Sequence, residues 1–223
     1  ERHCVQGLCH ECCENVGGCQ SGGHQGRPVA YMPWSRSEIM NDRVINLSHM
    51  QLFELPPRLG FHCMDTCSLD LSHNCLSTLA EHLALVRGLI NISLHHNLLT
   101  HIPFFFSSFH RLSFVDLRYN QVTAFPVCLL DLSQLRRLYL DHNQLCHLPQ
   151  DIDRLISLQT LSVGYNKITE ICATLFNIIG LQTLCFRGNS ELRSLPTSVR
   201  NLICLQKLDL SHCNLRQIPT TIG

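Results

Sequence analysis

The sequence predicts an α/β solenoid whose successive coils place short parallel strands in one sheet on the concave face. Two observations carry this prediction. Asparagine recurs every 23 residues through six positions, and every copy lies inside the same pattern of leucines. A fixed period of roughly 20 to 50 residues is typical of repeat architectures. The six asparagines are Asn74, Asn97, Asn120, Asn143, Asn166 and Asn189.

The leucine pattern predicts a strand and a buried corner in each copy. Residues 135–149 read Leu-x-x-Leu-x-Leu-x-x-Asn-x-Leu-x-x-Leu-Pro. Leu138 and Leu140 are two positions apart, so their side chains point to the same face of a strand. The asparagine is expected at the corner after the strand, where its amide can both accept and donate hydrogen bonds to backbone groups.

The copies number eight and extend the repeat domain over residues 42–223, with the last copy truncated. Met50 takes the asparagine position in the first copy, and Cys213 takes it in the last. The seventh copy carries one extra residue, within 190–192. The copies begin at Asp42, Thr66, Leu89, Leu112, Leu135, Leu158, Leu181 and Leu205.

The second half of each copy is expected to form short 3-10 or helical turns on the convex face. Proline follows the repeat core in six copies and rules out a helix that continues through that point. Ala80 and Cys172 replace it in the two other copies, where a longer helical turn is expected. The prolines are Pro56, Pro103, Pro126, Pro149, Pro196 and Pro219.

A run of phenylalanines lies on the predicted convex turn of the third copy. By register, Phe106 and Phe109 face the core, and Phe104 and Phe105 are more exposed. The exposed pair could form a second docking spot, and local packing is the alternative.

Composition excludes two classes of partner. The chain has 17 basic and 17 acidic residues and no basic patch, so a nucleic-acid partner is not expected. No apolar run approaches the roughly 20 residues that span a bilayer, so no membrane span is expected.

Residues 1–41 differ from the repeats and are predicted to be a poorly ordered leader rich in cysteine and glycine. The spacing Cys9-x-x-Cys12 is half of a zinc-binding spacing, and no second well-spaced pair follows. Metal binding by this segment stays open as an alternative. Its cysteines are Cys4, Cys9, Cys12, Cys13 and Cys19.

The cysteines of the repeats favour a cytoplasmic location. They occupy different repeat positions, which suggests no regular pairing, and several sit where a small apolar residue would serve. Free buried cysteine is typical of reducing compartments. Two glycosylation sequons, at Asn46 and Asn91, point the other way, but both fall on predicted strands.

The third, fifth, seventh and eighth positions of each copy point out of the concave sheet and are the candidates for partner binding. Side chains of neighbouring strands lie about 4.8 Å apart, so the fourth and fifth copies bring aromatic and arginine side chains together. Tyrosine, phenylalanine and arginine are common at binding hot spots. We call the following set the central patch: Phe114, Asp116, Arg118, Tyr119, Arg137, Tyr139, Asp141 and His142.

Histidine recurs at the eighth position. His49, His73 and His96 hold it in three consecutive copies, and His95 adjoins. Imidazoles in a row could bind a metal or sense pH, and a coupled row should titrate below pH 6.5. Ser-His-Asn is also an ordinary turn sequence in such repeats. The sequence favours this turn role, so no metal site is expected.

No enzyme chemistry is expected. The chain shows no Ser-His-Asp order, phosphate-binding glycine loop or paired metal motif. Asp70, Ser72 and His73 are close in sequence, but nothing in the pattern buries them to shift a pKa. No cofactor is expected either.

The consensus resembles the 23-residue intracellular class of leucine-rich repeats. It is similar to the repeats of Ras suppressor protein, of plant Ras-group-related proteins, and of Scribble and Erbin. The resemblance implies a cytoplasmic adaptor or scaffold for a partner protein, often near small-GTPase signalling. The leader, the two missing prolines and the absence of a C-terminal cap depart from the pattern. The alternatives are a sensor segment of a larger kinase, ubiquitin ligase or immune receptor, and an extracellular recognition domain.

Overall fold

The computed structural model describes residues 43–56, 59 and 66–220. The expectations for the leader at residues 1–41 lie outside the described residues.

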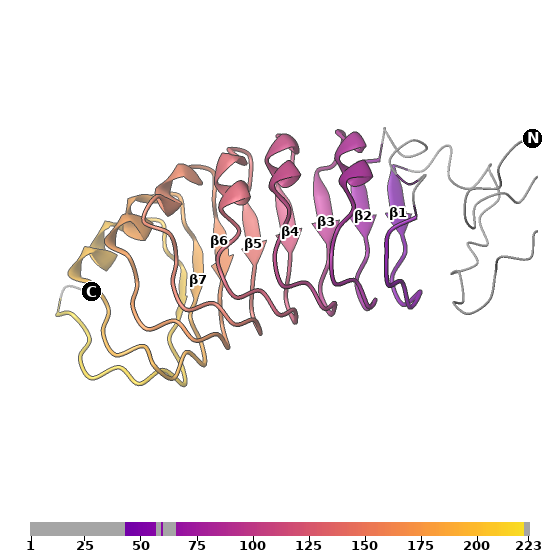
Figure 1. The fold of residues 1–223 in the computed structure, drawn as a ribbon. Helices are drawn as coiled ribbons and strands as arrows, with labels where there is room; N and C mark the ends of the chain where they lie inside the picture. Colours follow the sequence, from indigo (N-terminus) through magenta and orange to yellow (C-terminus); the bar gives the residue numbers. More distant parts are fainter. Residues whose placement is uncertain (1–42, 57–58, 60–65, 221–223) are drawn as a thin grey trace, which may run out of the picture.

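The predicted solenoid is confirmed. Eight parallel strands form one sheet in sequence order (Figure 1). In each three-residue strand the middle side chain faces the interior, and its neighbours face outward. The strands are β1 (Val44–Asn46), β2 (Ser68–Asp70), β3 (Asn91–Ser93), β4 (Phe114–Asp116), β5 (Arg137–Tyr139), β6 (Thr160–Ser162), β7 (Thr183–Cys185) and β8 (Lys207–Asp209).

Short 3-10 turns alternate with the strands and return each coil to the sheet (Figure 1). They have three to five residues, as expected for this tight helix type. The turns are η1 (Glu81–Leu85), η2 (Phe104–Ser108), η3 (Val127–Asp131), η4 (Ile152–Arg154), η5 (Ala173–Asn177) and η6 (Thr197–Asn201).

The expectation of longer helical turns after Ala80 and Cys172 was wrong. The turns that follow them have five residues, the same as the turn after Pro103. Ala80 has φ −76° and ψ 145°, and Cys172 has φ −64° and ψ 139°. Pro103 has nearly the same backbone, with φ −63° and ψ 150°. An extended residue therefore precedes these turns with or without proline, and proline only favours that conformation.

The asparagines form a buried ladder that joins neighbouring coils. Asn120 donates from Nδ2 to the carbonyl oxygens of Leu94 and Leu117, at 3.0 and 3.1 Å. Its Oδ1 accepts from the backbone N–H of Leu99 at 3.0 Å. The Leu117 oxygen also accepts from Asn143 at 2.9 Å, so one carbonyl serves two coils. The same bonds recur at Asn74, Asn97, Asn143, Asn166 and Asn189.

The two exceptions in the ladder differ in their bonding. Met50 donates its backbone N–H to Oδ1 of Asn74 at 3.0 Å and lies in the first coil that the structure describes. Cys213 makes one side-chain contact, from Sγ to the Phe186 oxygen at 3.2 Å. A thiol is a weak donor, so this joint has less hydrogen bonding than the others.

The extra residue of the seventh copy lies after its strand, as expected. The Leu192 N–H donates to the Asn189 oxygen at 3.1 Å and closes a tight turn there. Strand pairing is undisturbed, because Cys185 on β7 still pairs with Asp209 on β8. The turn absorbs the insertion before the next coil begins.

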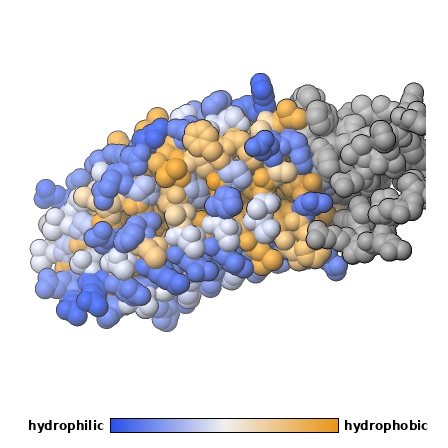
Figure 2. Space-filling model, in the orientation of Figure 1, coloured by the Kyte–Doolittle hydropathy of each residue, from blue (hydrophilic) through white to orange (hydrophobic). Residues whose placement is uncertain are grey.

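The phenylalanine run is split between core and surface, as the register predicts. Phe106 and Phe109 are fully buried, with ring centroids 5.2 Å apart. Phe104 is 75% exposed, and Phe105 is partly buried against the core. Figure 2 shows apolar residues in patches between hydrophilic ones. Among the residues that the structure describes, no helix is both long enough and apolar enough to cross a membrane.

Candidate functional site

The central patch brings arginine and aromatic side chains into contact on β4 and β5. The Arg137 guanidinium lies over the Phe114 ring, 4.9 Å from its centroid. The Arg118 guanidinium lies 5.2 Å from the Tyr139 centroid, and the two rings are 5.8 Å apart. Both arginines are thus held against rings, and Phe114, Arg118 and Tyr139 are half-buried. The patch is a preorganised cluster of cation–π contacts.

Asp116 positions Arg118 from below the surface. Asp116 is only 2% exposed, and its Oδ2 accepts from Arg118 Nη2 at 2.6 Å. Arg118 Nε and the Arg118 backbone N–H both donate to Asp116 Oδ1, at 3.0 and 3.1 Å. The hydrogen bond that Arg118 donates to this carboxylate raises the Arg118 pKa. Asp116 therefore orients Arg118, and its own carboxylate is not at the surface.

Asp141 is tied to the next coil rather than standing free. Its Oδ1 accepts from Ser162 Oγ at 2.6 Å and from the Gly164 N–H at 2.9 Å. A Cβ at Gly164 would lie 2.8 Å from that oxygen and 3.1 Å from the Arg187 carbonyl oxygen, so a larger residue would displace the Asp141 carboxylate. A shallow hollow of about 240 Å³ lies beside this contact. It is lined by Arg118, Tyr119, Tyr139, Asp141, His142, Ser162, Tyr165, Cys185 and Arg187.

The hollow extends beyond the central patch. It continues onto Tyr165 and Arg187 of the next two coils. The Arg187 guanidinium lies 5.8 Å from the Tyr165 centroid, which adds a third contact between an arginine and a ring. Both residues occupy outward positions, so their repeat positions were the signal that could have found them.

The eighth positions form a continuous stack of six rings. Successive centroids are 4.1 to 4.3 Å apart, and the interplanar angles are at most 13°. Tyr165 ends the stack against Gly188, where a Cβ would lie 2.6 Å from its ring. We call this set the ring stack: His49, His73, His96, Tyr119, His142 and Tyr165.

Every residue of the ring stack has a left-handed backbone, with φ between 51° and 59°. This conformation costs about 1–2 kcal/mol for a residue with a side chain. Aromatic pairs contribute about 0.5–1.5 kcal/mol beyond the area that they bury. The two terms are similar, so stacking offsets much of the backbone cost. The histidine pattern alone did not reveal that tyrosines complete the row.

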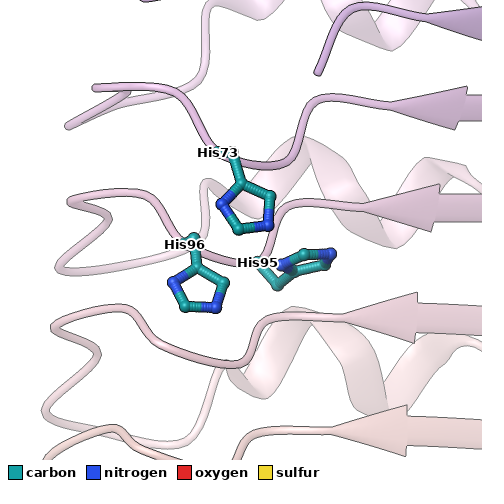
Figure 3. A group of neighbouring side chains, drawn as sticks. All are labelled: His73, His95 and His96. Carbon is teal, nitrogen blue, oxygen red and sulfur yellow. The ribbon is translucent and has the colours of Figure 1, made fainter. Parts of the chain in front are cut away.

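Three histidines converge between β2 and β3. His73 and His96 are stacked at 4.3 Å, and His95 meets His73 edge-on at 4.8 Å (Figure 3). One ring nitrogen from each lies within 4.8 Å of the other two. Burial, followed by the charges of neighbouring histidines and Arg118, lowers the His96 pKa. Burial also lowers the His95 pKa, against the pull of Asp116. Of the described side chains, these three are the candidates to hold a metal.

We expect His95 and His96 to titrate with midpoints below 6.5 in protein treated with EDTA. Their folded pKa values are lowered, so the folded state binds fewer protons than the unfolded state as pH falls below 6.5. Their contribution to stability is therefore complete above pH 6.5 and is lost as pH falls through the folded pKa values. NMR of the imidazole Hε1 signals measures the midpoints, and values at or above 6.5 would contradict this expectation.

Comparison with known proteins agrees with this architecture. A family model described as "Leucine-rich repeat region" matches residues 85–216, more than half of the chain. No curated protein matches the chain significantly.

Solved structures show the same fold. A leucine-rich-repeat protein of Leptospira interrogans is 23% identical, with a TM-score of 0.65 over 84% of this chain and 59% of its own. The leucine-rich-repeat domain of the type III effector XopL is 21% identical, with a TM-score of 0.68 over 82% of this chain and 73% of its own. An internalin of Listeria monocytogenes is 22% identical, with a TM-score of 0.66 over 78% of this chain and 48% of its own. The chain thus spans less than two thirds of the Leptospira protein and about half of the internalin. By its repeats, its coils and the family model, the chain belongs to the leucine-rich-repeat family.

Proposed function

We propose that this chain is a non-enzymatic scaffold that binds a partner protein through the central patch. Leucine-rich-repeat domains typically bind proteins, which supports the general role. The observation that favours this particular surface is the set of arginines held over the rings of Phe114 and Tyr139.

The arginines of the central patch are already held in place, and this favours tight binding of a partner. A long side chain that becomes ordered on binding costs about 0.5–1.5 kcal/mol. Arg118 is already ordered by the carboxylate of Asp116, and Arg137 by the ring of Phe114. Less conformational freedom is therefore lost when a partner covers them. The mixture of cations, rings and the tied carboxylate of Asp141 suits a partner surface with acidic and apolar groups.

We further propose a cytoplasmic adaptor role in signalling of the small-GTPase type. Its support is the resemblance of the repeats to those of Ras suppressor protein, together with the thiol chemistry. Cys128 and Cys172 are buried free thiols, and burial raises the Cys128 pKa to about 11. Such a thiol resists oxidation, as suits a core cysteine in a reducing compartment.

A comparison of bound partners tests the central patch. The double variant Arg137→Glu with Tyr139→Ala removes two cation–π contacts, Arg137 with Phe114 and Arg118 with Tyr139, and reverses one charge on the concave face. We expect partners captured from cell extract, and then measured with purified protein, to bind about 30-fold more weakly or worse. That loss corresponds to about 2 kcal/mol, the usual size of a hot-spot effect.

The matched control is Arg200→Glu with Phe53→Ala, at two residues that lie outside the strands. It makes the same charge change and removes one exposed ring, because Phe53 is 68% exposed and Arg200 is exposed. Circular dichroism melting of both variants shows that they are folded. If the concave variant keeps the wild-type partners, or the control loses them equally, the central patch is not the binding surface.

A further inference from the structure

The group His73, His95 and His96 has the donor set of a metal site. Each imidazole offers one nitrogen, and all three nitrogens lie within 4.8 Å of one another. Nitrogens bound 2.0–2.1 Å from a tetrahedral zinc ion are about 3.3 Å apart. The Cα positions therefore need no large shift, because rotation of the side chains can close a gap of this size. Figure 3 shows the three rings side by side on the turns that follow β2 and β3.

We propose that His73, His95 and His96 bind one zinc ion on the rim of the concave sheet. Imidazole is a favoured ligand for zinc, and three protein ligands leave a fourth position for water or for a carboxylate of a bound partner. This second possibility would make the metal part of a shared surface. The proposal stands independently of the central patch.

Ring orientation decides what must change when zinc binds. The His73 and His96 rings are parallel within 12°, and an imidazole lone pair lies in the plane of its ring. A metal between two parallel rings would be out of line with both lone pairs. Binding therefore turns at least one ring out of the stack, which separates it from His49 or Tyr119 on its other side. His95 already lies edge-on to both rings, at interplanar angles of 85° and 74°.

The charges around the group suit a cation. The negative charges of Asp70 and Asp116 favour a positive charge at His95, and the positive charge of Arg118 opposes it. Two carboxylates against one guanidinium leave one net negative charge beside the imidazoles. The histidines are also biased towards the neutral form that ligates metal, because burial favours it at His95 and His96.

Zinc titration of the full chain, followed by NMR of the imidazole Hε1 signals under reducing conditions, tests the site. We expect the signals of His73, His95 and His96 to shift together and to saturate at one zinc ion for this group. The ring signals of His49 or Tyr119 should shift too, because the ring stack opens on the outer side of His73 or of His96. Site-resolved signals separate this group from the cysteines and histidines of residues 1–41.

Two variants and one control make the result decisive. His95→Gln and His96→Asn should each raise the Kd of this site at least about tenfold, since loss of a direct ligand exceeds the effect of losing an outer partner. His142→Asn removes a stacked histidine whose ring neighbours are Tyr119 and Tyr165, and it should leave the Kd unchanged. Asparagine tolerates the left-handed backbone of both stack positions. The proposal is wrong if zinc leaves the three signals unmoved, or if all three variants alter the Kd equally.

Discussion

Phe106→Ala is expected to lower the free energy of unfolding by about 3–5 kcal/mol. The Phe106 ring is fully buried and packs edge-on against Phe109 at a centroid distance of 5.2 Å. Truncation removes apolar area from the core and leaves a cavity that neighbouring coils fill only in part, because the backbone of each coil is bonded to the next. Urea denaturation followed by circular dichroism measures the loss.

Another phenylalanine of the same turn, Phe104, supplies the matched comparison. Phe104→Ala removes the same side chain from the same 3-10 turn, but Phe104 is 75% exposed. Its cost should be within about 0.5 kcal/mol of zero. Equal losses for the two variants would show that the turn does not separate core from surface as described.

Asn120→Ala should cost about 1–3 kcal/mol, the second largest loss. The substitution leaves the Leu99 N–H without its acceptor in a buried place. The Leu94 and Leu117 carbonyl oxygens each keep one amide donor, from Asn97 and Asn143, which limits the loss. Thermal melting measures the effect, and a melting curve like that of the wild type would mean that the ladder register is wrong.

Cys213→Ala tests the weak joint of the same ladder. The Cys213 thiol makes a single contact to the Phe186 oxygen, so its removal should cost less than about 1 kcal/mol. If Cys213→Ala lowers the free energy of unfolding more than Asn120→Ala does, the asparagine amide is not the group that stabilises the ladder.

The interior of the solenoid was predictable because two periods agree. Alternation by two places Val115 and Leu117 on one face, and the 23-residue period repeats that choice in every coil. A shift of the strand register by one residue would expose both side chains, so no alternative register is similar in free energy. The length of the turns was less predictable, because proline shows where a helix cannot continue and not how long the turn beyond it is. Ala80 adopts the same backbone without a proline.

The candidate site was only partly predictable, because its contacts depend on rotamers and backbone strain. The outward positions of Phe114 and Arg137 follow from the strand, so their proximity could be expected. The burial of Asp116 could not, because it depends on Arg118 folding back over it. The ring stack was also hidden, since residues other than glycine are uncommon at positive φ and tyrosine gives no local signal for that conformation.

The hydrogen bonds that recur between coils come from backbone groups and one asparagine amide, whereas side-chain contacts such as Asp141 with Ser162 are particular to single coils. The outward side chains of β4 and β5 take no part in those recurring hydrogen bonds, so they can be substituted without weakening the bonds between coils. A whole coil could likewise be duplicated or deleted, because the asparagine of any coil bonds only to main-chain atoms, those of its own coil and of the coil before it. The architecture is therefore modular, and new binding preferences can evolve on it while the framework stays as it is.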